Sequence, residues 1–148
     1  MPEPTASPPT GLIWPCAACG AKNRVAPARL HAGPRCGKCE APLTAAPVDV
    51  DDAQLQALVA GASVPVLVDF WAPWCGPCRA VAPELTKLAA RAQGRVVVAK
   101  VNTDQHQATF ASLGGRAIPT LALYEGGRAV KVEAGARMGR QLDAFVGL

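Results

Sequence analysis

Two cysteines in the run WCGPC, residues 74–78, stand where a strongly apolar segment meets a segment with a helical pattern. At such a junction a thiol is exposed enough to react, and the unpaired N–H groups and the positive end of the helix dipole lower its pKa. Cys75 is therefore the candidate nucleophile, and Cys78, one helical turn later, would resolve a mixed disulfide formed on Cys75. The pair predicts thiol–disulfide exchange; the alternatives are an inert buried disulfide or half of a metal site.

The other four cysteines form two further C-x-x-C pairs separated by sixteen residues: Cys16, Cys19, Cys36 and Cys39. This spacing is typical of a tetrahedral four-cysteine zinc site, in which each pair forms a knuckle that points two sulfurs at one metal. Gly20 and Gly37 are expected to relax the backbone where the knuckles turn. Four thiolates leave no coordination position for water or substrate, so we expect one structural Zn²⁺ per chain.

Two other arrangements of these four sulfurs fit the spacing. One is a pair of structural disulfides, although the chain begins without the basic and apolar stretches of a secretory signal. The other is an iron site, since four thiolates accept either metal. His31 lies outside both pairs and is expected at the surface. Because so small a module buries little apolar surface, metal binding is expected to supply on the order of 10 kcal/mol of its folding free energy.

Composition and charge narrow the class of protein. Half of the 148 residues are hydrophobic, and no apolar stretch reaches the roughly 20 residues that cross a bilayer. We therefore expect a soluble, cytoplasmic protein without a membrane partner. The net charge of +4 is concentrated in residues 1–46, which hold five Lys or Arg and two Glu. A zinc ion with four thiolates carries a charge of about −2, which removes most of this excess, so no nucleic-acid partner is expected.

The chain divides into three parts by composition. Residues 1–13 are rich in proline and small polar residues and predict a flexible tail. Residues 14–46 hold the four-cysteine module and a short linker. Residues 47–148 hold the WCGPC run and have the length of an ordinary small domain.

Strand and helix patterns alternate through this third part. Strands are expected at 48–50, 64–71 and 95–101, with helices between them, the first of which is capped by Asp51. Right-handed crossover connections make these three strands parallel. A Gly126-Gly127 turn then predicts an antiparallel hairpin, and an amphipathic helix closes the chain. The fold class is therefore α/β, with a central mixed sheet flanked by helices.

Asp69 interrupts the apolar strand that leads to the cysteines. An ionised carboxyl is costly to bury, so burial would raise the pKa of Asp69 into the range where it can accept and return protons. The alternative is an aspartate at the strand end that faces water, as most aspartates do. The first interpretation predicts an acid–base group beside the dithiol.

The segment VDFWAPWCGPC, residues 68–78, resembles the active site of the thioredoxin family, and the resemblance extends through most of the chain after residue 47. Residues 14–43 resemble the cysteine-rich extension of the bacterial thioredoxin 2 type. The resemblance implies a thioredoxin fold with a small N-terminal zinc ribbon. It also implies that Asp69 assists deprotonation of Cys78 through water and that Lys100 is a partly buried neighbour of Asp69. The alternative for Lys100 is a solvated strand lysine.

The segment Ile118-Pro119-Thr120 resembles the cis-proline loop of the same family, which lies opposite the two cysteines and pairs with an extended substrate peptide. The alternative is a trans proline at the head of a strand. Ala117 departs from the glycine or valine of many members. The resemblance implies a substrate-binding surface made of six residues: Trp74, Gly76, Pro77, Ile118, Pro119 and Gly135.

The implied function is a protein-disulfide reductase that acts on protein disulfides, with thioredoxin reductase as the electron donor. Gly76 and Pro77 between the cysteines resemble the reducing members; an oxidase or isomerase is the alternative within the same chemistry. Outside enzymes, the alternative is a zinc-containing interaction or chaperone protein that uses the fold as a scaffold. We expect a monomer without a bound organic cofactor, and a 47–148 fragment that keeps its activity.

Overall fold

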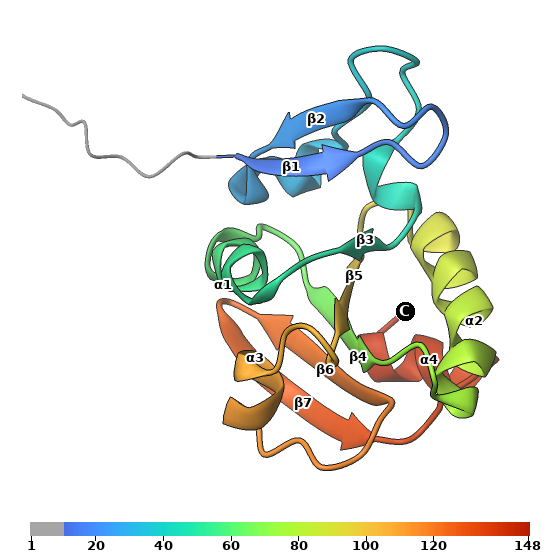
Figure 1. Ribbon diagram of the computed structural model, residues 1–148. Coiled ribbons are helices and arrows are strands. Elements are labelled where there is room, and N and C mark those ends of the chain that lie inside the picture. Colours follow the sequence, from blue (N-terminus) through green and yellow to red (C-terminus); the bar gives the residue numbers. More distant parts are fainter. Residues whose placement is uncertain (1–10) are drawn as a thin grey trace, which may run out of the picture.

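The computed structural model describes residues 11–148, in which an N-terminal module of short elements lies against a larger α/β domain (Figure 1). A flexible tail was expected at residues 1–13. Residues 1–10 lie outside the described part of the chain, and Leu12 and Ile13 belong to the first strand. Each helix of residues 11–148 is too short or too polar to span a bilayer.

The N-terminal module is built on a β-hairpin and two short 3-10 helices. Strands β1 (Leu12–Pro15) and β2 (Lys22–Val25) pair antiparallel. The 3-10 helices η1 (Pro27–Ala32) and η2 (Leu43–Ala45) follow. Side chains along the hairpin alternate between an inward and an outward face, as the period of two in a strand requires.

The larger domain contains a five-stranded sheet in the order β3-β5-β4-β6-β7. Its strands are β3 (Val48–Asp49), β4 (Val66–Trp71), β5 (Val97–Asn102), β6 (Thr120–Glu125) and β7 (Arg128–Ala134). Strands β3, β4 and β5 are parallel, and β6 and β7 add an antiparallel hairpin at one edge. The predicted mixed sheet is confirmed.

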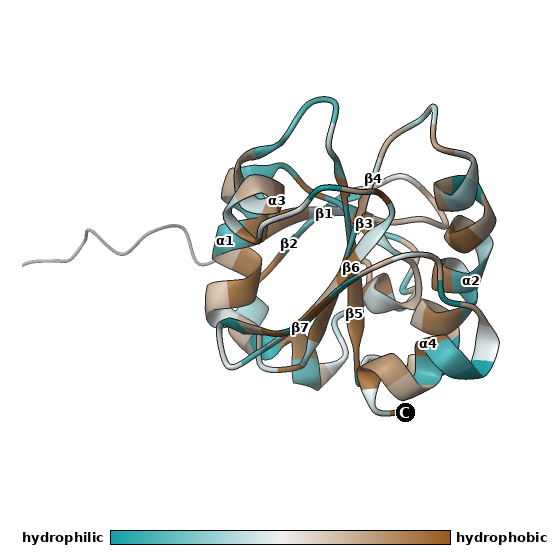
Figure 2. Cartoon of the chain, turned by 90° about the horizontal axis from the view of Figure 1, so that it is seen from below, coloured by the Kyte–Doolittle hydropathy of each residue, from teal (hydrophilic) through white to brown (hydrophobic). Residues whose placement is uncertain are grey.

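Helices cover both faces of this sheet (Figure 2). Helices α1 (Asp52–Gly61) and α3 (Ala108–Ser112) lie on one face, and α2 (Gly76–Ala92) and α4 (Gly139–Val146) lie on the other. Asp51 caps α1 as predicted: its carboxylate accepts the Gln54 N–H at 2.7 Å, and the Gln54 side chain accepts the Asp51 N–H.

Alternation along β4 decides which face of the sheet Asp69 occupies. Val66 and Val68 pack in the core with α1, whereas Leu67 packs in the core with α2 and α4. Because side chains alternate with a period of two, Asp69 shares the face of Leu67. The carboxyl therefore points to the side of the sheet that carries α2, whose first turn holds Cys78.

The N-terminal module and α1 share one hydrophobic core, which neither the cysteine spacing nor the composition indicates. Trp14, Leu30 and Leu43 of the module are buried in the same cluster as Leu55 and Leu58 of α1. A fragment that begins at residue 47 would expose this face of α1 to water. The expectation that a 47–148 fragment is active by itself therefore did not include this shared core.

The module and the dithiol lie at opposite ends of α2 (Figure 1). Near the C-terminal end of the helix, Ala90 and Gln93 line a pocket together with Arg35 and Thr44 of the module. Cys75 stands at the N-terminal end. A helix of 17 residues is about 25 Å long, so the module is remote from the surface around the dithiol.

Candidate active site and metal centre

The dithiol closes into a disulfide at the first turn of α2. Cys75 is the N-cap residue of this helix and is bonded to Cys78, with Pro77 between them in the first turn. The Cys78 N–H donates to Cys75 Sγ at 3.1 Å. Once the disulfide is reduced, a sulfur that accepts an N–H at a helix N-terminus is stabilised as a thiolate. The predicted strand-to-helix junction is present, and its geometry favours Cys75 as the nucleophile.

Both cysteines are almost fully buried in this disulfide form. Only 4% of Cys75 and 2% of Cys78 is exposed, so the expectation of an exposed thiol is wrong for this state. The cause is the N-cap position, at which Cys75 directs its sulfur toward the end of the helix. The flanking Trp74, Gly76 and Pro77 are exposed instead, as expected for a docking surface. A substrate would have to sit closely on these neighbours for its sulfur to reach Cys75.

Asp69 is fully buried on β4, as predicted. Neither carboxyl oxygen has a hydrogen-bond partner among the described residues. Burial raises the pKa of Asp69 to about 7, and the nearby Lys100 ammonium opposes only part of this shift. A carboxyl with this pKa can exchange a proton near neutral pH, on the face of the sheet that α2 covers.

Lys100 lies beside Asp69 on the neighbouring parallel strand, where the two residues share one register position. Its side chain is half-buried, and its Nζ lies 4.7 Å from the centre of the Trp71 ring. Lys100 and Trp71 also line a pocket of about 440 Å³ together with Asp49, Asn102 and other residues of the same edge. Lys100 is therefore a partly buried neighbour of Asp69, as the resemblance implied, and its side chain also lines this pocket.

The loop before β6 lies at the same end of the sheet as the dithiol. The Ile118–Pro119 peptide bond is cis, as predicted. Thr120 pairs with Phe70 at the end of β4 that leads to Cys75, so the loop and the dithiol approach from adjacent strands. The Pro119 carbonyl accepts the Gly135 N–H at 2.8 Å. Gly135 has a φ of +109°, a conformation that side-chain-bearing residues rarely adopt.

One residue near the dithiol is absent from the sequence-based predictions. The indole N–H of Trp74, a side chain that is 68% exposed, donates to the Asp104 carboxylate at 3.0 Å. Asp104 follows β5, thirty residues later in the chain, and no local pattern connects it with the WCGPC run. This hydrogen bond fixes the orientation of the exposed indole beside Cys75.

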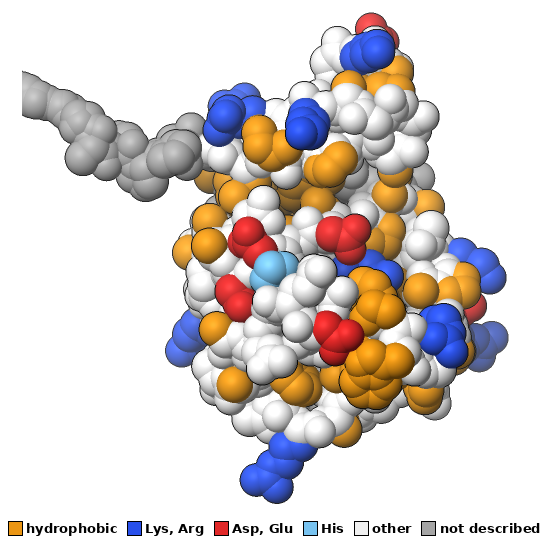
Figure 3. All heavy atoms as spheres, viewed as in Figure 1, with side chains coloured by type: hydrophobic (Ala, Val, Ile, Leu, Met, Phe, Trp, Pro, Cys, Tyr) orange, Lys and Arg blue, Asp and Glu red, His pale blue; other side chains and the backbone are white. Residues whose placement is uncertain are grey.

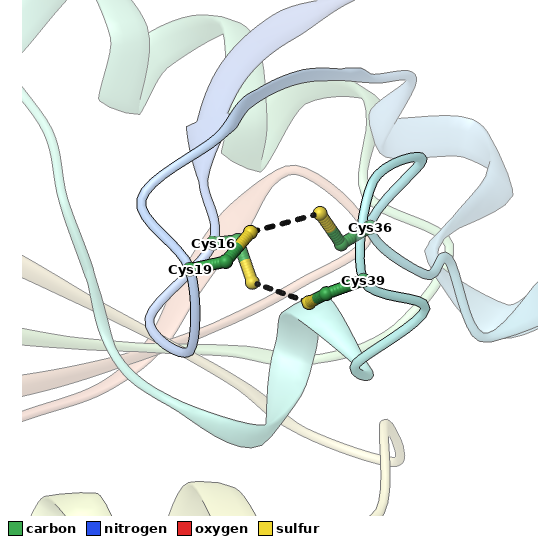
Figure 4. Close-up of side chains that lie close together, drawn as sticks. All are labelled: Cys16, Cys19, Cys36 and Cys39. Atoms are coloured by element: carbon green, nitrogen blue, oxygen red, sulfur yellow. Dashed lines mark hydrogen bonds between the residues drawn. The ribbon is translucent and has the colours of Figure 1, made fainter.

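The four cysteines of the N-terminal module meet in one cluster, as their spacing predicted (Figure 4). All four sulfurs lie within 4.8 Å of one another. The distances from Cys16 Sγ to Cys39 Sγ and from Cys19 Sγ to Cys36 Sγ are both 3.6 Å. A tetrahedral zinc–thiolate centre with bonds of about 2.3 Å has sulfurs about 3.8 Å apart. The cluster thus fits a four-coordinate metal, and these cysteines are free thiols, contrary to the alternative of structural disulfides.

The two knuckles repeat the same backbone geometry. In each, the N–H of the residue after the second cysteine donates to the carbonyl of the first: Gly20 to Cys16, and Glu40 to Cys36. Both donors have positive φ angles, 78° and 68°. The expectation for Gly20 is confirmed, whereas the one for Gly37 is wrong: Glu40 holds the strained position, because the left-handed residue follows the second cysteine of a knuckle.

The thiols of the cluster differ in acidity. Backbone hydrogen bonds from Cys39 and Lys38 lower the pKa of Cys36 to about 6. The pKa of Cys39 is raised to about 12: the backbone hydrogen bond from Ala41 lowers it, but hydrogen bonds with Cys16 and the other thiols outweigh this effect. Four thiols packed together therefore do not all ionise by themselves. A cation that neutralises them would complete the site.

His31 takes no part in the cysteine cluster. It is exposed, as expected, and its Nδ1 lies 2.9 Å from the hydroxyl of Ser63. The candidate metal ligands in the described part of this module are therefore the four cysteine sulfurs.

Comparison with known proteins agrees with both parts of the molecule. The family profile described as "Thioredoxin" matches residues 46–147, and the profile described as "Thioredoxin 2, N-terminal" matches residues 15–41. Thioredoxin from Haemophilus influenzae is 44% identical over 97 residues, which are 66% of this chain and 91% of that protein. Thioredoxin C-3 from Corynebacterium nephridii is 39% identical over 113 residues, which cover 76% of this chain and 77% of that protein.

A solved structure supports the same assignment. A mutant thioredoxin from Halobacterium salinarum NRC-1 superposes with a TM-score of 0.64 and is 31% identical, covering 70% of this chain and 89% of its own. The family profile, the relatives and the fold agree with the position of the Cys75–Cys78 pair at the start of α2. The chain therefore belongs to the thioredoxin family of thiol–disulfide oxidoreductases.

Proposed function

We propose that this protein reduces disulfides in other proteins. In the reduced form, the Cys75 thiolate attacks a substrate disulfide, which breaks the substrate S–S bond, forms a mixed disulfide and releases one substrate thiolate. Cys78 then attacks Cys75 Sγ, which closes the Cys75–Cys78 disulfide and releases the second substrate thiolate. The substrate gains two electrons and two protons. The observation that carries the proposal is the Cys75–Cys78 disulfide at the N-cap of α2, the product of this reaction.

Asp69 is proposed to accept the proton of Cys78. Its carboxyl is buried on the face of the sheet toward α2, has no hydrogen-bond partner among residues 11–148, and has a pKa raised to about 7. A water molecule would carry the proton between the thiol and the carboxyl. Lys100 is proposed to assist by adjusting the charge next to Asp69, with which it shares a register position.

The substrate is proposed to bind as an extended peptide across the dithiol. Trp74, Gly76 and Pro77 offer exposed surface on one side of Cys75. The loop that holds Ile118 and Pro119 is proposed to supply the other side, and the Gly135 N–H holds this loop through its hydrogen bond to the Pro119 carbonyl. The alignment of this loop with the end of β4 supports the arrangement.

The N-terminal module, taken as residues 14–46, is proposed to hold one structural zinc ion on Cys16, Cys19, Cys36 and Cys39. The geometry of the four sulfurs fits that ion. Bound there, zinc would stabilise the fold of the module and leave no position for substrate. The remaining proposals extend the family resemblance: a monomer in the cytoplasm, without an organic cofactor or nucleic-acid partner, that thioredoxin reductase re-reduces.

An insulin-reduction assay driven by NADPH and a bacterial thioredoxin reductase tests the function. We expect turnover by the wild-type protein and none by Cys75→Ser. A protein that serves only as a scaffold would give no turnover above the background of the reductase. An oxidase or isomerase would reoxidise reduced substrate or reshuffle wrong disulfides faster than it reduces insulin.

A further inference from the structure

The outward face of the β1–β2 hairpin combines cations with apolar side chains. Ile13 pairs with Arg24 and Pro15 pairs with Lys22 across the two strands, and all four residues are exposed. Ile13 is 43% exposed, which is unusual for an isoleucine. The inward face of the same hairpin carries the buried Trp14 in the shared core, so the outward face is held in a fixed position on the molecule.

The cations of this surface have no acidic partner within residues 11–148. The described part of the module, 11–46, has five Lys or Arg and a single acidic residue, Glu40, so it keeps a charge of about +2 even with a zinc–tetrathiolate centre of charge −2. Lys22 and Arg24 form no ion pair with a described carboxylate, and the Arg24 guanidinium donates only to the Gly11 carbonyl. Figure 3 shows Lys and Arg side chains beside hydrophobic ones on the module, while acidic side chains gather on the domain below it. The hairpin face therefore has an apolar side on β1, Ile13 and Pro15, next to a cationic side on β2, Lys22 and Arg24.

Two features indicate a protein as the occupant of this surface, and a third leaves the active site accessible. Its cations need carboxylates as counter-charges, and Ile13 and Pro15 need apolar contacts, which an acidic polypeptide with interspersed apolar residues offers together. The aromatic side chain of the hairpin, Trp14, is buried and unable to stack on bases. The hairpin also belongs to the module, which meets α2 at the end opposite Cys75 (Figure 1), so an occupant would leave the dithiol free.

We propose that the outward face of the hairpin, residues Ile13, Pro15, Lys22 and Arg24, docks an acidic segment of disulfide-bearing substrate proteins. This inference rests on the proposed reductase function for the identity of the partner. Docking would hold the substrate near the molecule and raise the effective concentration of its disulfide at Cys75. The module would thereby select substrates and not merely stabilise the domain.

Fluorescence anisotropy with the zinc-loaded full chain tests the docking step. The probe is a labelled peptide of alternating Glu and Leu without cysteine. We expect saturable binding in low salt. The charge-reversal variant Lys22→Glu/Arg24→Glu should weaken the affinity about tenfold in low salt and about twofold or less in 0.5 M salt. The variant Lys87→Glu/Arg128→Glu makes the same charge change on the redox domain, at exposed positions outside the site, and is expected to bind within about twofold of wild type.

Three outcomes would overturn the docking surface: no binding of the probe in low salt, equal weakening by both charge reversals, or a DNA oligonucleotide that binds through Lys22 and Arg24 more tightly than the probe. Equal weakening would mean that net charge alone attracts the probe. Metal content and circular dichroism of the variants show that they are folded. Because the Lys22 and Arg24 side chains are exposed, we expect the metal content and the circular dichroism of the variant to match wild type.

A kinetic experiment tests substrate selection separately. Two peptides carry the same disulfide, and one also carries the Glu-Leu segment on a flexible linker of about 25 residues, which spans about 28 Å on average. We expect kcat/KM for the acidic peptide to exceed that of the plain peptide about fivefold or more, and Lys22→Glu/Arg24→Glu to abolish this advantage while leaving the plain peptide unchanged. Equal rates for both peptides would refute substrate docking. Reduction of neither peptide would instead refute the reductase function, and the anisotropy result would still decide the surface.

Discussion

The carboxyl of Asp69 on β4 stands beside Lys100 on β5, at one register position of two parallel strands, and yet no hydrogen bond from residues 11–148 reaches either of its oxygens. Burial therefore dominates the acidity of this group. The ammonium of Lys100 lowers the pKa, but the loss of water raises it further, to about 7. Two consequences follow, one for stability and one for the reaction.

The stability of the protein should fall as pH rises from about 4 to about 7. In the unfolded chain Asp69 ionises near its ordinary pKa of 3.8, whereas in the folded chain it keeps its proton up to about 7. Folding therefore becomes less favourable across this window, by about 4 kcal/mol in total. Asp69→Asn does not ionise, so its free energy of unfolding should gain about that amount relative to wild type between pH 4 and pH 8.

Urea unfolding of the oxidised protein at several pH values measures this difference. Glu125→Gln, at an exposed position, is the matched control and should follow the wild-type curve. Parallel pH curves for wild type and Asp69→Asn would show that the buried carboxyl does not carry the effect.

The same substitution should slow the reaction near neutral pH. Without a proton acceptor beside Cys78, the second exchange step would wait for spontaneous ionisation of the thiol, and we expect disulfide reduction to slow by about tenfold to a hundredfold. The loss should diminish at high pH, where Cys78 ionises without help. Stopped-flow tryptophan fluorescence across pH 6–9 measures it; a loss that stays constant with pH would indicate altered structure and not lost proton transfer.

Cys75 should react before Cys78 in the reduced protein. Its sulfur accepts the Cys78 N–H at the helix N-terminus, so its thiolate fraction is the larger at neutral pH. Limiting iodoacetamide followed by peptide mapping should find most of the label on Cys75. With Cys75→Ser, labelling at the same pH should be slower than in wild type. Preferential labelling of Cys78 in the wild-type protein would reverse the assigned roles.

Metal should belong to the N-terminal module alone. We expect one zinc per chain in wild type and in Cys75→Ser/Cys78→Ser, and loss of zinc in Cys16→Ser/Cys36→Ser, because the last variant removes two of four clustered sulfurs. Elemental analysis of the purified variants measures this. Zinc that disappears with Cys75 and Cys78, or an iron absorption spectrum in wild type, would contradict the assignment.

Leu30→Ala should destabilise the entire chain. Leu30 belongs to the N-terminal module, is fully buried, and lies in the same hydrophobic cluster as Leu55 of α1. Truncation of a buried leucine costs about 2–5 kcal/mol, and the shared core transmits this cost to both parts. Urea unfolding, followed by fluorescence and by zinc release, should show one transition moved to lower urea. Ile13→Ala, on the exposed face, should change stability by less than about 1 kcal/mol.

Zinc release in a separate, earlier transition, with the redox domain unfolding at its wild-type midpoint, would show that the two parts fold independently. In that case a fragment from residue 47 onward would be stable in spite of the apolar face that it exposes.

Local patterns in the sequence were enough for the elements of the redox domain and for the candidate site residues. Apolar runs rich in β-branched residues and helical patterns predicted its strands and helices, because burial favours these patterns in a chain that folds into layers. The hairpin and the 3-10 helices of the N-terminal module were not predicted. Asp51 with Gln54, and the WCGPC run at the start of α2, act through neighbours within four residues, so their roles are legible in the chain itself. The spacing of the two C-x-x-C pairs likewise predicts that their four sulfurs lie close together, since thiolates at that spacing bind one metal ion.

The tertiary structure alone decided the contacts between residues that are distant in sequence. The hydrogen bond from Trp74 to Asp104 spans thirty residues, and the shared core of Leu30 with Leu55 joins two modules that composition separates. Gly37 was expected to relax the turn of the second knuckle, but the residue with a positive φ there is Glu40. Its φ follows from the closed geometry of the knuckle. Such contacts depend on which surfaces meet when the layers pack. Hydrophobic packing is non-directional, so burial of an apolar side chain is favourable with many partners, and the local sequence does not identify which one is used.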